Sequence, residues 1–263
     1  MTVLMIAGHP RSGTTLLQTL CDLHPEMAVT NEFGCFAFLG NRYLPYARQI
    51  VDRWQRVKNK WAFDIAYADD HENLSKNNLR FALRHLYHFR KQYRGQVTAV
   101  SLEATYRAMF PYAKVVGDKW PHYLFRMEEF AQEKDLTRLV IYRDCRDVTS
   151  SFLQQARTNW SDANWIHKVD NAEKVAARWV RGIEIMEAHA DKIIVLQYET
   201  LMYQPKQELQ RVSQALGLDL AGFPTDMINP SSIGKYKKGL TPEELDTVMA
   251  VAGSTMERLG YAL

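Results

Sequence analysis

Short runs of apolar residues recur along the chain without the polar alternation that is typical of a half-buried strand. They occupy residues 3–7, 114–116, 139–142 and 193–196, and residues 27–30 resemble a fifth run. The runs are too short for helices and rich in β-branched residues, as are strands buried on both faces. We therefore predict a central parallel sheet of about five strands with helices on both faces.

Segments with apolar residues at helical spacing lie between these runs. The predicted helices span residues 14–23, 74–93, 124–131, 148–156, 171–190 and 205–216. The pattern is best in residues 171–190, where we assign Trp179 to the core rather than to cofactor stacking. The sequence Thr241-Pro242-Glu243-Glu244 predicts one more helix after it, because it combines a capping box with a proline in the first turn.

The alternation of strands and helices favours a single α/β domain over residues 1–263. We find no internal repeat, low-complexity tract or linker in the sequence. Residues 33–67 are rich in aromatic side chains and lack strand–helix alternation. We interpret residues 33–95 as a helical insertion over the sheet edge.

Composition narrows the class of protein. With 46% hydrophobic residues in a chain of 263, disorder is excluded. A net charge of +3 is too small for a nucleic-acid-binding protein but allows a small anionic ligand. The three cysteines form no CxxC pair, which favours a reducing cytoplasm. The first residues carry no signal-peptide pattern and no membrane-spanning run, so we expect a soluble protein.

A glycine-bracketed loop, Gly8-His9-Pro10-Arg11-Ser12-Gly13-Thr14-Thr15, follows the first strand and leads into a helix. In this arrangement backbone N–H groups and a helix N-terminus cradle a phosphate. The Gly-x4-Gly spacing matches the P-loop of nucleotide triphosphatases. However, Thr14 replaces the P-loop lysine and the cation sits earlier, at Arg11. This departure disfavours a conventional ATPase or GTPase.

Further polar residues stand at or just after the ends of other predicted strands. They are Glu32, Lys119, Arg143 and Tyr198. Because open parallel sheets bind ligands beyond the carboxyl ends of their strands, these residues and Arg11 can reach one crevice.

These residue types suit the chemistry of group transfer. Arg143, with Ser151 eight residues later, suits a terminal phosphate, although Arg143 could instead pair with Asp147. Glu32 suits a general base, with Glu103 and His122 as rivals.

The loop from Pro10 to Leu17 resembles the 5′-phosphosulfate-binding loop of the sulfotransferase superfamily, which uses 3′-phosphoadenylyl sulfate (PAPS), in its bacterial and Golgi-type branch. The Arg143–Ser151 spacing, Lys119-Trp120-Pro121 and Tyr198-Glu199-Thr200-Leu201 resemble further elements of that superfamily. Residues 231–238 resemble its C-terminal donor-contacting segment, with Tyr236 where a tryptophan is frequent and Gly234 where one branch has a serine.

The resemblance implies a P-loop-like three-layer fold and a role for each matching residue. The residues implied to bind the donor are Arg11, Ser12, Gly13, Thr14, Thr15, Arg143, Ser151, Tyr198 and Lys235. Arg143 and Ser151 would hold the 3′-phosphate and Tyr198 would lie near the adenine. Arg11, Glu32 and Lys119 would be catalytic, with Glu32 as the base and Lys119 assisting the leaving group.

The predicted activity is in-line transfer of a sulfuryl group from PAPS to a hydroxyl or amine, which leaves 3′-phosphoadenosine 5′-phosphate (PAP) and requires no metal. The expected acceptor is a small molecule, lipid or carbohydrate, bound near the 33–95 insertion. Two alternatives are a P-loop small-molecule kinase that uses ATP and a non-catalytic nucleotide-binding module. The sequence leaves open the acceptor, the oligomeric state and the role of residues 231–238.

Overall fold

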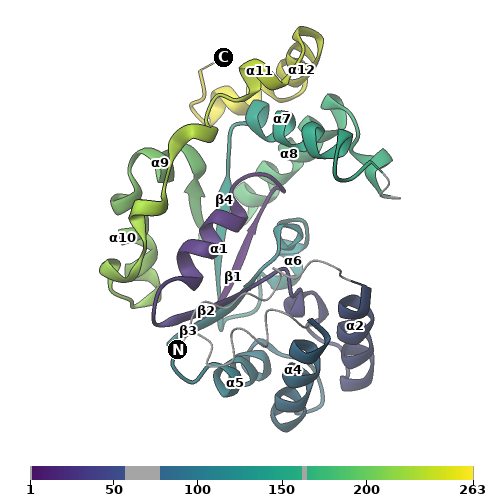
Figure 1. Ribbon diagram of the computed structural model, residues 1–263, viewed down its shortest axis with the longest axis vertical. Coiled ribbons are helices and arrows are strands. Elements are labelled where there is room, and N and C mark those ends of the chain that lie inside the picture. The colour runs from purple at the N-terminus through teal and green to yellow at the C-terminus, as the bar shows by residue number, and fades with distance from the viewer. Residues whose placement is uncertain (1, 57–77, 162–164, 263) are drawn as a thin grey trace.

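The computed structural model describes residues 2–56, 78–161 and 165–262 (Figure 1). A five-stranded parallel sheet runs through its centre in the order β2-β3-β1-β4-β5. The strands are β1 (Thr2–Gly8), β2 (Met27–Asn31), β3 (Val115–Lys119), β4 (Leu136–Tyr142) and β5 (Ile194–Gln197). The predicted sheet is confirmed, including its fifth strand at residues 27–30. Strand β3 lies between β1 and β2, so the first two strands of the chain are not neighbours.

The side chains of the central strand enter two separate hydrophobic clusters. In β1, Val3, Met5 and Ala7 pack into one cluster, whereas Leu4 and Ile6 pack into the other. Because both faces of this strand are buried, its apolar run shows no polar alternation.

Helices cover both faces, which confirms the three-layer α/β fold. Helices α1 (Thr14–Asp22), α9 (Tyr198–Tyr203) and α10 (Pro205–Leu216) cover one face. The other face packs against α2 (Tyr43–Arg56), α4 (Asn78–Gln92), α5 (Ala99–Met109), α6 (Met127–Phe130), α7 (Cys145–Arg157), α8 (Ala172–Ala188) and α12 (Pro242–Arg258). In Figure 1, α10 and α6 lie on opposite sides of the sheet.

Most predicted helices are present, with shifted ends. The expected helix at 124–131 is instead a 3-10 helix, η3 (Pro121–Arg126), followed by the single turn of α6. Helix α5 was not predicted, because its buried polar residues Ser101 and Thr105 interrupt the apolar stripe. The capping box at Thr241 and Glu244 and the core position of Trp179 are confirmed.

The described parts of residues 33–95 are helical and contain η1 (Cys35–Phe38), α2 and α4. Residues 57–77 of the aromatic-rich stretch, with Trp61, lie outside the described residues. That this region is an insertion within a single domain stays a prediction. Within the described ranges, no helix is long and apolar enough to cross a membrane. The cytoplasmic location stays a prediction.

Candidate active site

The glycine-bracketed loop connects β1 to α1 and leaves the start of that helix open. Gly13 has φ +94°, and a Cβ atom there would lie 2.4 Å from Cδ2 of Tyr198, so that only glycine fits. Gly13 also caps α1, and no side chain of the described ranges accepts a hydrogen bond at this cap. The first N–H groups of α1 are therefore suited to bind an anion at the loop.

A cavity of about 320 Å³, which we name the small cavity, lies beside this loop. It is lined by eight of the nine residues predicted to bind the donor: Arg11, Gly13, Thr14, Thr15, Arg143, Ser151, Tyr198 and Lys235. The exception is Ser12, which does not line the small cavity and whose buried hydroxyl has no hydrogen-bond partner among the described residues. Leu16, Asp147, Ser150, Gln154 and Ser232 complete the lining.

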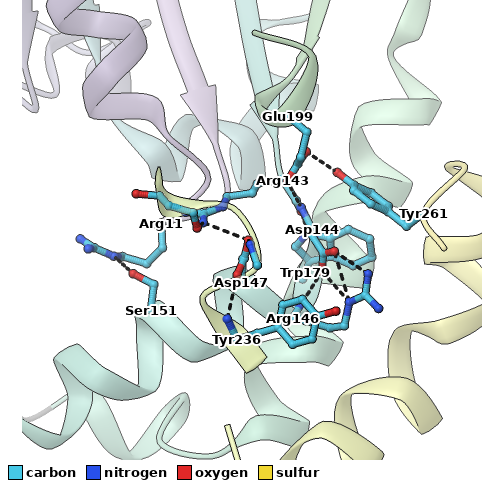
Figure 2. Close-up of polar contacts among 12 residues, drawn as sticks. Arg11, Arg143, Asp144, Arg146, Asp147, Ser151, Trp179, Glu199, Tyr236 and Tyr261 are labelled. Atoms are coloured by element: carbon cyan, nitrogen blue, oxygen red, sulfur yellow. Dashed lines mark hydrogen bonds and ion pairs between the residues drawn. The ribbon is translucent and has the colours of Figure 1, made fainter. Parts of the chain in front are cut away.

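Arg143 is held in the small cavity by several contacts (Figure 2). Its Nη2 lies 3.1 Å from Oδ2 of Asp147 and donates to the carbonyl of Ser232. The guanidinium carbon lies 4.5 Å from the ring centre of Tyr198. The Nε atom is buried and has no partner in the part of the chain that the structure describes. The ion pair that the sequence offered as an alternative is present, yet one donor of Arg143 remains for a ligand.

Asp147 attaches residues 231–238 to this cavity. Its Oδ2 and Oδ1 accept hydrogen bonds from the backbone N–H groups of Gly234, at 2.8 Å, and Tyr236, at 3.0 Å (Figure 2). This attachment brings Lys235 to the cavity lining. The segment whose role the sequence left open is thus a wall of the small cavity.

Arg11 contributes a second guanidinium. Its Nε donates to the hydroxyl of Ser151 at 3.0 Å (Figure 2). Burial lowers the pKa of Arg11, and the positive charge of Arg143 lowers it further. Two neighbouring guanidinium groups repel each other unless an anion lies between them. Their arrangement therefore favours phosphate or sulfate binding.

Lys119 and Glu32 form an ion pair beside the same loop. The Nζ of Lys119 donates to Oε1 of Glu32 at 3.0 Å and to the hydroxyl of Thr15 at 3.1 Å. The lysine side chain is fully buried, whereas that of Glu32 is 39% exposed. Burial lowers the pKa of Lys119, and the charge of Glu32 opposes this effect. Lys119 therefore links the candidate base to the first turn of α1.

Asp118, which is not among the predicted site residues, holds the turn directly after β2. Its carboxylate accepts hydrogen bonds from the backbone N–H groups of Phe33 and Gly34, at 2.9 and 2.8 Å. It also accepts from the hydroxyls of Thr30, at 2.7 Å, and Tyr123, at 2.5 Å. An aspartate directly after Val115, Val116 and Gly117, in a run that indicates a buried strand, is the sequence signal that could have identified it.

A second cavity of about 960 Å³, which we name the large cavity, is lined by Glu32 and shares Arg11, Thr14 and Thr15 with the small cavity. Its other lining residues are Pro10, Pro121, His122, Phe125, Phe152, Trp160, Trp165, Val169, Ala177, Arg178 and Arg181. The described residues of the 33–95 region are not among them. The two cavities meet at the loop. The small cavity adds Arg143, Lys235 and hydroxyl groups, whereas the large cavity adds Glu32, aromatic rings and two further arginines.

The structure separates the three candidate bases. Glu103 pairs with Arg107, which also donates to the carbonyls of Ala113 and Lys114, so Glu103 lies near the amino end of β3, away from the loop. His122 lines the large cavity, but its Nδ1 lies 2.9 Å from Nη2 of Arg178. Because arginine only donates, this nitrogen is an acceptor whose lone pair is in use. Glu32 therefore fits the role of base best.

Comparison with known proteins places the chain in a family. A model described as the sulfotransferase family matches residues 4–222, and the chain therefore belongs to the sulfotransferase family.

Solved structures of sulfotransferases share the fold. The sulfotransferase domain of the Synechococcus PCC 7002 olefin synthase is 17% identical, with 100% of this chain and 95% of that chain covered and a TM-score of 0.60. The sulfotransferase domain from the curacin biosynthetic pathway is 15% identical, with 100% and 98% covered and a TM-score of 0.58. Sulfotransferase STF9 from Mycobacterium avium is 14% identical, with 99% and 77% covered and a TM-score of 0.54. At these identities the likeness concerns the fold.

Proposed function

We propose that the protein transfers a sulfuryl group from PAPS to a hydroxyl or amine of a small-molecule, lipid or carbohydrate acceptor in the cytoplasm and releases PAP. Membership of the sulfotransferase family supports the reaction class. The observation that carries the proposal is the meeting of the two cavities at Arg11, Thr14 and Thr15. In-line transfer needs a donor on one side of the moving group and an acceptor on the other.

The small cavity has the side chains that a nucleotide with several phosphates requires. Arg11, Arg143 and Lys235 supply positive charge, and Thr15 and Ser151 supply hydroxyl groups. The buried Nε of Arg143 lacks a partner within the described residues, as expected of a donor that a bound phosphate would satisfy. We assign the Arg11–Thr15 loop to the 5′-phosphosulfate, and Arg143 with Ser151 to the 3′-phosphate, and place Tyr198 near the adenine.

The bound donor would supply the activated sulfuryl group, and residues of this chain would supply the proton transfer and the charge. Glu32 lines the large cavity and would remove the proton from the acceptor hydroxyl. The buried ammonium of Lys119, bonded to Thr15, would stabilise negative charge that develops on the leaving phosphate oxygen. The sulfuryl group carries one negative charge, so we propose transfer without a metal ion.

Ligand-dependent stability tests the donor. A hundredfold excess of PAP over its Kd should add about 2.7 kcal/mol to the free energy of unfolding and raise Tm. Magnesium-ATP should stabilise the protein far less. Stabilisation by magnesium-ATP without any by PAP would overturn the proposal in favour of a P-loop kinase.

Substitution of the base tests the reaction. Glu32→Gln should abolish sulfuryl transfer from labelled PAPS into a metabolite extract and leave PAP binding unchanged. Retained turnover would move the base to His122. Binding of PAP without transfer to any acceptor by the unmodified protein would indicate a non-catalytic nucleotide-binding module.

A further inference from the structure

One side of the large cavity is formed by positively charged residues of α8. Arg178 and Arg181 stand three positions apart on this helix, so they share one face, and both line the cavity. The proposed transfer reaction gives neither of them a task.

Arg178 is held in place by an imidazole and a phenyl ring. Its Nη2 donates to Nδ1 of His122 at 2.9 Å, and its guanidinium carbon lies 4.6 Å from the ring centre of Phe125. Burial lowers the pKa of Arg178, although an arginine keeps its charge at neutral pH. The buried neighbour His9 stays neutral, because burial and the charge of Arg178 lower its pKa to about 3. The guanidinium is thus partly desolvated and held rigid.

The described residues offer no carboxylate to balance this charge. Glu32 is the one carboxylate among the described residues that line the large cavity, and it pairs with Lys119. Within the described ranges, neither Arg178 nor Arg181 has a carboxylate oxygen within 4.0 Å. Because an unpaired, partly buried cation is costly, a ligand that brings a negative charge would be favoured here.

The rest of the lining suits an apolar body. The rings of Phe152 and Trp160 pack edge to face with their centres 5.2 Å apart, and the ring centres of Trp160 and Trp165 are 5.4 Å apart. The volume of about 960 Å³ is at the upper end of the range for small-molecule sites. The cavity therefore has room for an apolar body larger than a single ring.

We propose that the acceptor of this sulfotransferase is an amphipathic anion, whose oxyanion group binds Arg178 and Arg181 while its apolar part lies on the aromatic lining and its hydroxyl reaches Glu32. The proposal rests on the proposed function and adds the class of acceptor. The anion acts as a counter-ion for α8 and orients the molecule in the cavity. Arg178 and Arg181 line only the large cavity, so this anion site is distinct from the small cavity, where other cations would bind the donor.

The test is calorimetric titration of PAP-saturated protein with probes of matched shape. The probes are 6-hydroxy-2-naphthoate, 6-hydroxy-2-naphthyl phosphate and the neutral 6-hydroxy-2-naphthamide. We expect at least one anionic probe to bind at least tenfold more tightly than the amide. The double variant Arg178→Gln and Arg181→Gln should reduce this preference to less than threefold.

One control variant on the same helix and one single arginine variant complete the experiment. Lys174→Gln removes another cation of α8, one that pairs with Asp170 and does not line the large cavity, and it should keep the preference. Arg181→Gln alone changes an exposed side chain and should still weaken anion binding if the double variant folds poorly.

Two outcomes would overturn this inference: equal binding of anionic and neutral probes, including no binding of any probe, or a preference that survives in both arginine variants. PAP binding by the same protein is measured first. Its absence would mean that the proposed function fails, whereas normal PAP binding without anion preference would mean that only the acceptor inference fails.

Discussion

Lys119 and Glu32 form a 3.0 Å ion pair beside Thr15, which lines both cavities, and the lysine of this pair has no exposed surface. The same Nζ bonds to Thr15 of the loop. One buried cation thus contacts both the candidate base and the first turn of α1. This position lets it respond to charge that moves from the acceptor side to the donor side.

Lys119→Met should therefore lower kcat strongly. Loss of one group that stabilises developing charge typically reduces kcat by about 10²–10³-fold. PAP affinity should change by less than about tenfold, since other cations line the small cavity. The control is Lys114→Met, which removes an exposed lysine paired with Glu26 just before the same strand. Equal turnover in Lys119→Met and Lys114→Met would show that Lys119 does not stabilise the transition state.

Asp118→Asn should disturb the turn that carries Glu32. The asparagine NH₂ group would face donors where the carboxylate now accepts four hydrogen bonds, two of them from Phe33 and Gly34. We expect a loss of about 1–3 kcal/mol in the free energy of unfolding. We also expect a lower kcat with unchanged PAP affinity. Urea titration and PAP calorimetry measure the two effects.

Tyr123→Phe serves as the matched variant for this carboxylate, because it removes one of its donors and leaves the N–H contacts of Phe33 and Gly34 in place. It also removes the hydroxyl that accepts from the N–H of Phe36. It should lower the free energy of unfolding by about 1–3 kcal/mol and leave kcat nearly unchanged. An Asp118→Asn protein with normal stability and normal kcat would show that the carboxylate does not organise the turn.

Arg143→Gln should weaken PAP binding. Hydrogen bonds to charged groups contribute about 1.5–3 kcal/mol, which corresponds to about 10–150-fold in Kd. The variant should stay folded, because Asp147 keeps the backbone donors of Gly234 and Tyr236. Arg157→Gln is the control, since it removes an arginine at the end of α7 that pairs with Glu244. Calorimetry at constant salt measures PAP binding by both variants. Equal affinity of the two variants would contradict the assignment of Arg143 to the 3′-phosphate.

The strands and the strand-end residues could be predicted from the sequence, and the order of the strands could not. Apolar runs mark strands that are buried on both faces, and polar residues after such runs meet at one sheet edge. The position of β3 between β1 and β2 depends on pairings between distant segments. Glu103 illustrates the same limit, because only its contact with Arg107 shows that it lies near the other end of β3.

The residues that the sequence did not reveal act through partners from distant elements. Asp118 lies in a strand, and half of its contacts are with the turn after another strand. The apolar pattern of α8 predicts only that Arg178 stands outside the buried stripe. Its partners His122 and Phe125 belong to η3, a distant segment of the chain. Such roles arise from packing, which a helical or strand period does not encode.

The backbone at Arg11 predicts an unusual response to glycine. Arg11 and Glu32 are the two non-glycine residues with positive φ in the described ranges, at 75° and 61°. A left-handed conformation costs a residue with a Cβ atom about 1 kcal/mol, and glycine avoids this cost. Arg11→Gly should therefore be about 1 kcal/mol more stable than Arg11→Ala in urea titrations. Both should lose PAP affinity, and equal stability of the two would argue against strain at this position.

The free energy of unfolding should decrease as the pH is lowered below 6.5, and His85 should cause part of this decrease. This side chain is fully buried in contact with Tyr46, and burial lowers its pKa from 6.5 to about 3. The unfolded chain binds a proton below pH 6.5 while the folded chain does not, so the stabilisation is complete above pH 6.5 and is lost as the pH falls toward 3. Between pH 6.5 and 4.5 the loss is about 2.3 kcal/mol for one such histidine. His85→Phe should reduce the pH dependence of the free energy of unfolding by about this amount, whereas His167→Asn, at an exposed position, should not. An unchanged slope in His85→Phe would show that another group, such as buried His9, dominates the acid response.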